Sequence, residues 1–595
     1  MDTLSSRTHG LVAFPRPNES LRLFLCAPAP QRKNRNLATY SHLAEFFDDG
    51  HVEFHNWLDN MSESPNLALY LLEQVARMQA QLAQGRAELG AAMPARPDFM
   101  KVDGASRTAI RPSSRSAKTM NLHMRHRTGW PQRTVSGLRN LACTLAALGL
   151  GLVPCTFVSG QDNAPPNIVV ILADDLGYGD LGAYGQKKIK TPRLDQMATD
   201  GTLFTSFYAG NTVCAPSRVA LLTGTDMAHA HTRSNRGPGL READVTIAEV
   251  LKEAGYATGV FGKWGFGTPE TGAPDRQGFD EFLGYLGHVH AHSYYTDHLF
   301  AIQNGRTERV DTDSTVYTHD LFTEKALDFI ERHQDQPFFL YLPFALVHAE
   351  LLVPSDAMTP YQDSTGASLL KPEKPFPCCG VIGTYRGQPQ PHAAFAGMVS
   401  RLDRDVGRIL DRLAALGLDQ NTIVLFTSDN GPHVEGGADP GFFESNGPLR
   451  GLKRDLYEGG IRVPMIAWGP GLVPQQRISD HPWGNWDLLA TLTELAGVTA
   501  PATNGLSMAG LLRENGPVPV HRYLYWEFDN VWGGHYVQAI RNGDWKLLRF
   551  RETNRSWDEL YNLHSDIGEY NNLANRYPDI VDRLVQLIAN VRIEP

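Results

Sequence analysis

The chain has 595 residues, of which 42% are hydrophobic and 20% are charged, so it can bury large cores and should form more than one folding unit. Its formal net charge of −10 argues against nonspecific nucleic-acid binding, although a locally basic substrate cleft is compatible with that charge. Six cysteines without a C-x-x-C pair argue against a disulfide scaffold and against a zinc site.

The N-terminal part of the chain carries a secretory-signal pattern far from residue 1. Residues 101–140 contain nine Lys or Arg and one Asp, residues 141–158 are nearly all apolar or small, and small residues follow at 159–160. This layout across 120–160 predicts export to the periplasm or the medium. A membrane anchor is the alternative. Eighteen such residues could barely span a bilayer, which favours export.

A signal-like segment inside a chain indicates that translation begins at Met120 or Met124, so residues 1–119 form an extension of uncertain status. The alternative is a small fused module. Helical periodicity at 66–89 favours an amphipathic helix, and the Pro- and Arg-containing stretch at 92–116 is typical of a linker. The sequence assigns this extension no function.

Two apolar runs, at 167–173 and 422–428, end in polar side chains. Asp174 and Asp175 follow the first run, and Asp429-Asn430 follows the second, which predicts two buried parallel strands with oxygen ligands at their carboxyl ends. Adjacent carboxylates repel each other unless a cation lies between them, and hard oxygen ligands suit calcium or magnesium. Turn-forming or capping Asp and Asn after strands would explain either site alone.

The stretch Cys214-Ala-Pro-Ser-Arg218, followed by an apolar run and Thr223-Gly224, spells C-x-P-S-R-x-x-x-x-T-G. It resembles the signature of type I sulfatases, members of the alkaline phosphatase superfamily, in which this cysteine is oxidised to Cα-formylglycine. Read without that resemblance, it is a turn with Ser217 as the N-cap of a helix. The two interpretations are compatible, because a helix N-terminus favours an anionic sulfate.

The resemblance implies a site assembled from several further motifs. Gly262-Lys-Trp-Gly265 resembles the family's G-K-W-H, so Lys263 would bridge the sulfate and the formylglycine, while Gly265 replaces the usual histidine. His288, His290 and His292 are candidates for that missing role. We favour His292, because Ala291-His-Ser-Tyr-Tyr295 resembles an element of members that lack the first histidine.

Three more residues complete the implied catalytic set. His348, after the apolar run at 337–347, would protonate the leaving alkoxide, and Arg218 would stabilise the hydrated formylglycine. Lys453 lies in G-x-K-x-x-x-x-E-G-G-x-R-V-P and would be the second sulfate-binding lysine. The resemblance also implies one divalent cation, Ca²⁺ or possibly Mg²⁺, held by four ligands: Asp174, Asp175, Asp429 and Asn430.

Strand and helix patterns alternate in the catalytic region, which predicts an α/β fold with a mostly parallel sheet flanked by helices, as in the alkaline-phosphatase-like fold. We expect a helix at 246–254 before a strand at 257–261, and a last large helix at 480–497. The catalytic domain would cover 165–505. A smaller antiparallel subdomain, with a turn at 541–544, would follow at 506–595.

The predicted function is hydrolysis of sulfate esters, either aryl sulfates or sulfated carbohydrates, by an arylsulfatase-like enzyme. Its partners would be a sulfated small molecule or polysaccharide and a formylglycine-generating maturation enzyme, with no nucleic acid. Two alternatives stay open. One is a phosphonate or phosphate ester hydrolase on the same scaffold. The other is a degenerate sulfatase-like binding protein, which is suggested by Gly265 in place of the usual histidine.

Overall fold

The computed structural model describes four short N-terminal strands, at 11–15, 21–25, 42–46 and 52–56, and residues 165–593 with gaps at 267–271, 378–384, 514–515 and 531–533. The predicted helix at 66–89 and the signal-like segment at 120–160 lie outside the described residues, so both stay predictions. The N-terminal strands form an antiparallel sheet in the order β1 (Leu11–Pro15), β2 (Leu21–Leu25), β3 (His42–Phe46) and β4 (Val52–Asn56). This sheet was not predicted from the sequence.

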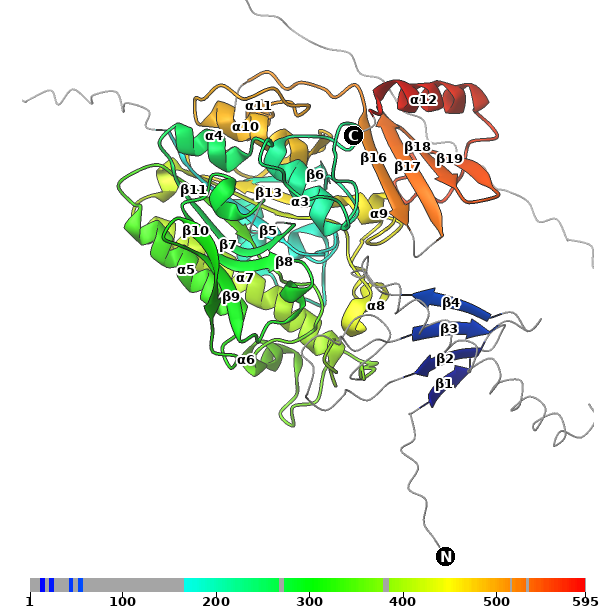
Figure 1. Ribbon diagram of the computed structural model, residues 1–595, viewed down its shortest axis with the longest axis horizontal. Coiled ribbons are helices and arrows are strands. Elements are labelled where there is room, and N and C mark those ends of the chain that lie inside the picture. Colours follow the sequence, from blue (N-terminus) through cyan, green and yellow to red (C-terminus); the bar gives the residue numbers. More distant parts are fainter. Residues whose placement is uncertain are drawn as a thin grey trace, which may run out of the picture. The chain divides into compact units, whose positions relative to one another are not determined.

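The centre of the catalytic region is a large mixed sheet (Figure 1). Its strands in chain order are β5 (Asn167–Ala173), β6 (Thr202–Tyr208), β7 (Ala257–Gly265), β8 (Glu281–Gly287), β9 (His298–Gln303), β10 (Arg306–Asp311), β11 (Phe338–Pro343), β12 (Thr422–Ser428), β13 (Arg462–Trp468), β14 (Arg477–Ser479) and β15 (Trp483–Gly484). Among the described residues the spatial order is β10-β9-β8-β7-β11-β5-β12-β13-β6-β14, and β15 also pairs with β6. The neighbours β8, β7, β11, β5 and β12 are all parallel, which confirms the predicted mostly parallel sheet.

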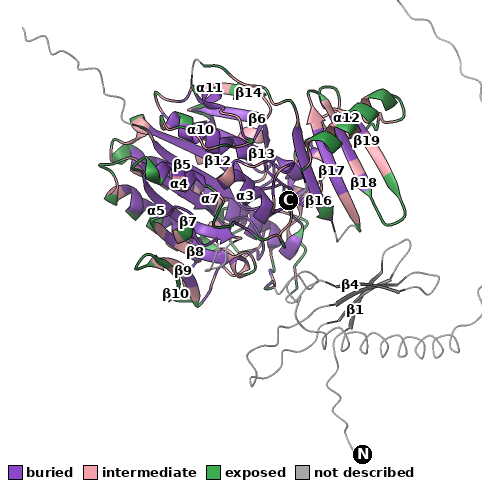
Figure 2. Cartoon of the chain, turned by 45° about the horizontal axis from the view of Figure 1, so that its top comes forward, coloured by how far each residue is buried: buried purple, intermediate pink, exposed green. Residues whose placement is uncertain are grey.

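Helices cover both faces of this sheet, and Figure 2 shows its central strands in the buried colour. One core packs α2 (Pro192–Thr199), α5 (Thr318–Arg332) and α7 (Pro391–Ala415) against Val169 and Ile171 of β5. The alternate residues Ile168 and Val170 belong to a second core with four further helices. These are α3 (Cys214–Thr223), α4 (Ile247–Glu253), α10 (Leu488–Leu495) and α11 (Ala509–Leu512). A strand buried on both faces needs an unbroken apolar run, which is the pattern at 167–173.

Short helical segments fill the connections, and several of them carry site residues. The α-helical ones are α6 (Ser355–Met358), α8 (Pro440–Phe443) and α9 (Glu458–Ile461). The 3-10 turns are η1 (Gly182–Tyr184), η2 (Pro274–Arg276), η3 (His290–His292), η4 (Thr359–Tyr361), η5 (Asp419–Asn421), η6 (Glu435–Gly437) and η7 (Asn485–Asp487).

The C-terminal part is a four-stranded antiparallel sheet, as predicted, and one helix packs against it. Its elements are β16 (Leu524–Asn530), β17 (His535–Asn542), β18 (Trp545–Arg551), β19 (Ser556–Asn562) and α12 (Pro578–Val591). Gly543 has φ of +62° in the turn between β17 and β18, a conformation that glycine adopts without strain. The core of this sheet continues into Tyr208 and Trp486 of the catalytic region, so the two parts share buried apolar surface.

Two local predictions were wrong. The helix expected at 480–497 is only α10, because Trp483 and Gly484 pair with β6 and the main-chain N–H of Gly484 donates to Asp487 Oδ2, which begins the helix later. Ser217 is not an N-cap: α3 begins at Cys214. The Ser217 hydroxyl lies inside the first turns and accepts from the main-chain N–H of Gly210 at 3.1 Å.

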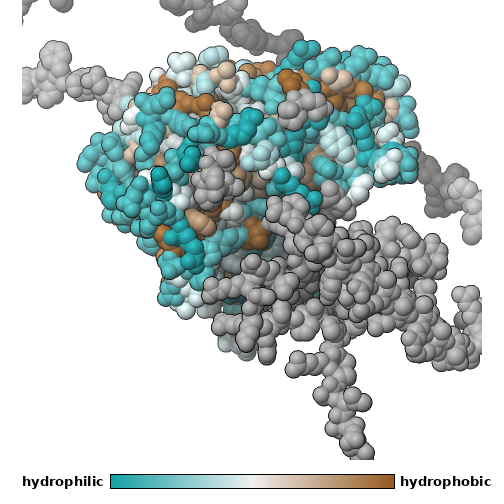
Figure 3. Space-filling view, in the orientation of Figure 1, coloured by the Kyte–Doolittle hydropathy of each residue, from teal (hydrophilic) through white to brown (hydrophobic). Residues whose placement is uncertain are grey.

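On the face that Figure 3 shows, the surface of the catalytic region is mostly hydrophilic, with scattered apolar side chains. Within the part of the chain that the structure describes, no helix combines the length and the apolar character needed to cross a membrane.

Candidate active site

The polar residues that follow β5 and β12 meet at one edge of the sheet. β5 and β12 are parallel neighbours with Ala173 opposite Ser428, so their carboxyl ends lie side by side. The main-chain N–H of Asp175 donates to Asp429 Oδ1 at 3.0 Å, and Asn430 Nδ2 donates to Asp175 Oδ1 at 2.7 Å. Asp174, Asp175, Asp429 and Asn430 are all completely buried, so the sequence-predicted ligands are brought together.

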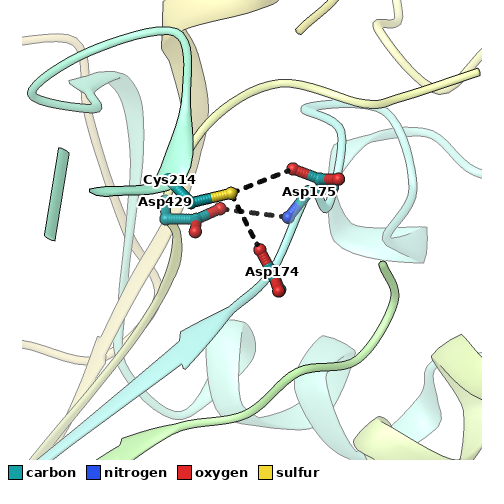
Figure 4. A group of neighbouring side chains, drawn as sticks. All are labelled: Asp174, Asp175, Cys214 and Asp429. Atoms are coloured by element: carbon teal, nitrogen blue, oxygen red, sulfur yellow. Dashed lines mark hydrogen bonds between the residues drawn. The ribbon is translucent and has the colours of Figure 1, made fainter. Parts of the chain in front are cut away.

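Cys214 is the first residue of α3 and points at this cluster (Figure 4). Its Sγ donates to Asp174 Oδ1 at 3.3 Å and lies 3.9 Å from Asp175 Oδ1. Burial and the nearby Asp429 raise the pKa of the Cys214 thiol well above its usual value. As encoded, the side chain is therefore a protonated thiol and a weak nucleophile.

Arg218 lies one turn further along α3 and extends to Asp429 and Lys263. Its Nε donates to Asp429 Oδ2 at 2.8 Å, and its Nη1 donates to the main-chain oxygen of Lys263 at 2.6 Å. Lys263, near the end of β7, donates from Nζ to Asp174 Oδ2 at 2.6 Å. Both cationic side chains are almost completely buried, and the guanidinium is fixed by bonds to two different strands.

Lys453 approaches from the loop before α9, and its Nζ donates to Asp175 Oδ2 at 2.7 Å. Burial opposes the charge of Lys453, but Asp175, Cys214 and Glu435 together outweigh burial, and the pKa of the ammonium is raised well above its usual value. The site thus balances three buried aspartates with three buried cations, Arg218, Lys263 and Lys453. Charges buried together in this number are stable only as a paired network.

The oxygen set fits a divalent cation. Lys263 and Lys453 occupy the Oδ2 atoms of the two adjacent aspartates, while the Oδ1 atoms face Cys214. One acceptor next to them, the side-chain oxygen of Asn430, is buried without any hydrogen-bond donor. A buried acceptor without a donor is costly unless a cation satisfies it, and carboxylate and amide oxygens are the ligands that calcium and magnesium prefer.

Two histidines stack beside the cluster. His348 follows β11; its Nδ1 donates to the main-chain oxygen of Ala349 at 2.6 Å, and its Nε2 faces Asp175 Oδ2 at 3.4 Å. The ring of His292, in η3, lies parallel to that of His348 with centroids 4.7 Å apart. Burial and Lys263 lower the pKa of His292 to about 3, so its imidazole is neutral. Of the other candidates, His290 instead stacks on His298.

Gly265, which stands where the family usually has a histidine, also has an unusual backbone conformation. Its φ is +92°, a region that residues with a side chain rarely adopt. The atoms closest to a Cβ built there belong to Lys263 and Arg218, at 3.6 Å or more, so space alone would admit a side chain. The backbone conformation is therefore what makes glycine the fitting residue.

Three residues that support the site were not predicted from the sequence. Asn235 accepts the main-chain N–H of Ala215 at 3.0 Å, which caps the first turn of α3. His433 and Glu435 are buried beside Asp175, and oxygen and nitrogen atoms of the three residues lie within 4.8 Å of one another. Only the sequence Asp429-Asn-Gly-Pro-His433 could have pointed to His433, because it follows a predicted ligand pair by three residues.

Comparison with known proteins identifies the family. The sequence profile of the Sulfatase family matches residues 166–498, and that of the N-sulphoglucosamine sulphohydrolase C-terminal domain matches residues 452–594. The chain therefore belongs to the sulfatase family and is a sulfuric ester hydrolase.

Individual relatives support the same class. The chain is 32% identical to N-acetylgalactosamine-6-sulfatase of Canis lupus familiaris over 466 residues, covering 72% of this chain and 78% of the relative. It is 32% identical to arylsulfatase A of Homo sapiens over 488 residues, covering 71% and 87%. A crystal structure of Ps i-CgsB in complex with k-i-k-neocarrahexaose matches with a TM-score of 0.59 at 27% identity, covering 72% of this chain and 94% of that one.

Proposed function

We propose that this enzyme hydrolyses sulfate esters of carbohydrates, with a formylglycine formed from Cys214 as the nucleophile and one divalent cation, Ca²⁺ or possibly Mg²⁺, bound at the sheet edge. The observation that carries the proposal is the position of Cys214. It begins α3, faces three buried aspartates, and has two lysines and an arginine around it. A maturation enzyme would be needed to oxidise the cysteine.

The protein residues have distinct tasks in this scheme. Asp174, Asp175, Asp429 and Asn430 would hold the cation, which supplies positive charge for an anionic nucleophile and for the sulfate group. Lys263 and Lys453 would leave their aspartates to bind sulfate oxygens. The hydrated aldehyde at residue 214 would use one hydroxyl to attack sulfur, and deprotonation of the other would re-form the carbonyl and release sulfate.

The two stacked histidines would handle the two proton transfers of the reaction. His348 donates from Nδ1 to a carbonyl, so the proton for the departing alkoxide would be carried on Nε2 of the doubly protonated ring, against a pKa that burial and Lys453 lower. His292 is neutral and buried next to it, as a proton acceptor for the nucleophile must be. His292 would therefore take the role left vacant by Gly265. Arg218 would stabilise the hydrate through its fixed guanidinium.

The names of similar proteins include an arylsulfatase, and two of them point to a carbohydrate substrate. One relative is called N-acetylgalactosamine-6-sulfatase, and one matching structure holds a neocarrahexaose. The hydroxyl oxygen of a sugar is also a poor leaving group unless it receives a proton, and His348 would be the residue that donates this proton. The signal-like segment at 120–160 supports export of the enzyme to the periplasm or the medium.

Sulfate release from defined substrates tests the proposal. Purified, matured enzyme would be given N-acetylgalactosamine-6-sulfate, a sulfated carrageenan oligosaccharide, 4-nitrophenyl sulfate and a phenyl phosphonate monoester, with Cys214→Ala as the control. We expect sulfate release from at least one saccharide and loss of that activity in the control. Turnover of the phosphonate alone would contradict the sulfate assignment, and turnover of the aryl sulfate alone would contradict the carbohydrate assignment.

A further inference from the structure

His433 is completely buried and packs against the histidine that the proposed function uses as proton donor. Its ring is nearly parallel to that of His348, with centroids 5.4 Å apart and an interplanar angle of 13°. The chain places it three residues beyond Asn430, in the segment that leads from β12 into η6. A stacked, buried histidine is either part of the core or part of the site, and its hydrogen bonds distinguish these two roles.

The hydrogen bonds of His433 fix the peptide that carries His348. Its Nε2 lies 3.1 Å from the main-chain oxygen of Val347. Because a carbonyl oxygen only accepts, Nε2 bears the hydrogen in either charge state of the ring. Val347 immediately precedes His348, so this bond restrains the backbone from which the His348 side chain projects. Tyr294 restrains the same loop, since its hydroxyl lies 2.6 Å from the oxygen of Ala345.

Glu435 and Arg454 hold His433 in turn. The Nδ1 of His433 lies 3.1 Å from the main-chain N–H of Glu435 and 3.0 Å from its Oε2. The other carboxylate oxygen of Glu435 is 2.5 Å from Arg454 Nη1. Arg454 is the neighbour of Lys453. This cluster therefore connects the loop that bears His348 with the loop that bears a sulfate-binding lysine.

We propose that His433 is a positioning residue for sulfate ester hydrolysis. By donating to the Val347 carbonyl it fixes the orientation in which His348 Nε2 gives its proton to the leaving oxygen as the sulfur–oxygen bond breaks, and Glu435 and Arg454 hold His433 in place. This inference rests on the proposed function of the same site. A purely structural histidine would affect folding, maturation or metal content without changing how the rate depends on the leaving group.

The leaving group supplies a readout that a structural role would not alter. A sugar alkoxide departs slowly without a proton, whereas 4-nitrophenolate departs without one, so acid catalysis matters far more for the sugar ester. His348→Ala should lower kcat on the sugar sulfate by about 10²–10⁴-fold and on 4-nitrophenyl sulfate much less. A substitution whose effect is transmitted through His348 should also lower kcat more on the sugar sulfate than on 4-nitrophenyl sulfate, but by a smaller factor.

Two matched substitutions separate the hydrogen bond from the rest of the ring. The amide nitrogen of Gln in His433→Gln can occupy the place of Nε2 and donate to the Val347 carbonyl, whereas that of Asn in His433→Asn is too short to reach it. We expect His433→Asn to lower kcat on the sugar sulfate about 10–100-fold, with KM and 4-nitrophenyl sulfate turnover changed less than about threefold. His433→Gln should recover most of the loss.

The experiment uses the full chain, with formylglycine content measured by mass spectrometry and metal content by elemental analysis, and rates expressed per matured site. A selective loss in His433→Asn that His433→Gln restores supports the proposal. Equal losses on both substrates, or no loss on either, would overturn it while leaving the sulfatase function intact. An inactive wild-type enzyme with full maturation would instead overturn the proposed function, and this inference with it.

Discussion

Lys546 of β18 occupies the centre of a buried ion network, and its removal should measurably destabilise the protein. Its Nζ is 2.8 Å from Glu458 Oε1 and 3.0 Å from Glu569 Oε1, and all three side chains are fully buried or nearly so. Glu458 begins α9, so the network ties the C-terminal sheet to the loop that carries Lys453. Lys546→Met retains most of the aliphatic volume and deletes the charge.

The loss of stability depends on the buried charges that remain after Lys546 is replaced. Breaking a buried pair costs about 3–5 kcal/mol, because the partner charge is left without compensation. Glu458 keeps Arg462 at 3.2 Å, and burial raises the pKa of Glu569 to about 7, so Glu569 can become neutral by taking a proton. We therefore expect about 3 kcal/mol at pH 6 and a larger loss at pH 8, where Glu569 is ionised. For residues 165–593 that is a decrease in Tm of about 3–4 °C.

Urea denaturation followed by tryptophan fluorescence, at pH 6 and pH 8, measures the loss. Lys252→Met is the matched control, because Lys252 pairs with Asp280 at 2.7 Å but both side chains are more than 40% exposed. An exposed pair contributes about 0–1 kcal/mol. The reasoning fails if Lys546→Met destabilises the protein no more than Lys252→Met does, or if its effect is smaller at pH 8 than at pH 6.

Three further predictions concern single groups. Burial raises the pKa of Asp180 from 3.8 to about 7, so the folded protein keeps this proton longer than the unfolded chain. The free energy of unfolding should therefore decrease as the pH rises from about 4 to about 7. In urea titrations across this range, Asp180→Asn should reduce that decrease by up to about 4 kcal/mol. Lys453→Met should lower kcat/KM for the sugar sulfate by about 10–100-fold through loss of a charge-assisted bond, and an unchanged value in steady-state kinetics would count against its sulfate role. Dialysis against EDTA should abolish turnover and lower Tm, with both restored by Ca²⁺ at a gain of about 2.7 kcal/mol when the ion exceeds its Kd a hundredfold; activity that survives complete chelation would exclude the metal site.

The strands and their terminal ligands could be predicted because local pattern and topology agree there. An apolar run such as 167–173 predicts a strand buried on both faces, and the carboxyl ends of parallel neighbours meet at one edge. Asp174 and Asp429 therefore come together although they are far apart in the chain. The motif around Cys214 predicted a helix there, but with its start at Ser217, whereas α3 begins at Cys214.

Other features depend on tertiary partners that no local pattern encodes. The start of α10 is determined by the pairing of Trp483 with β6, which periodicity at 480–497 does not reveal. Ser217 lies inside the helix because its hydroxyl accepts hydrogen bonds from the main-chain N–H of Gly210 and the side-chain amide of Asn485. His433 appears in the sequence as one histidine in a loop, and its contact with Val347 exists only after β11 and β12 are placed on either side of β5.

The chemical state of residue 214 tests the central claim most directly. Peptide mass spectrometry across Cys214, on enzyme from its native host, would be combined with sulfate release from a sulfated saccharide by the same sample. We predict formylglycine at residue 214, with turnover proportional to the fraction converted. Full turnover by a preparation in which residue 214 is entirely unmodified cysteine would contradict the account.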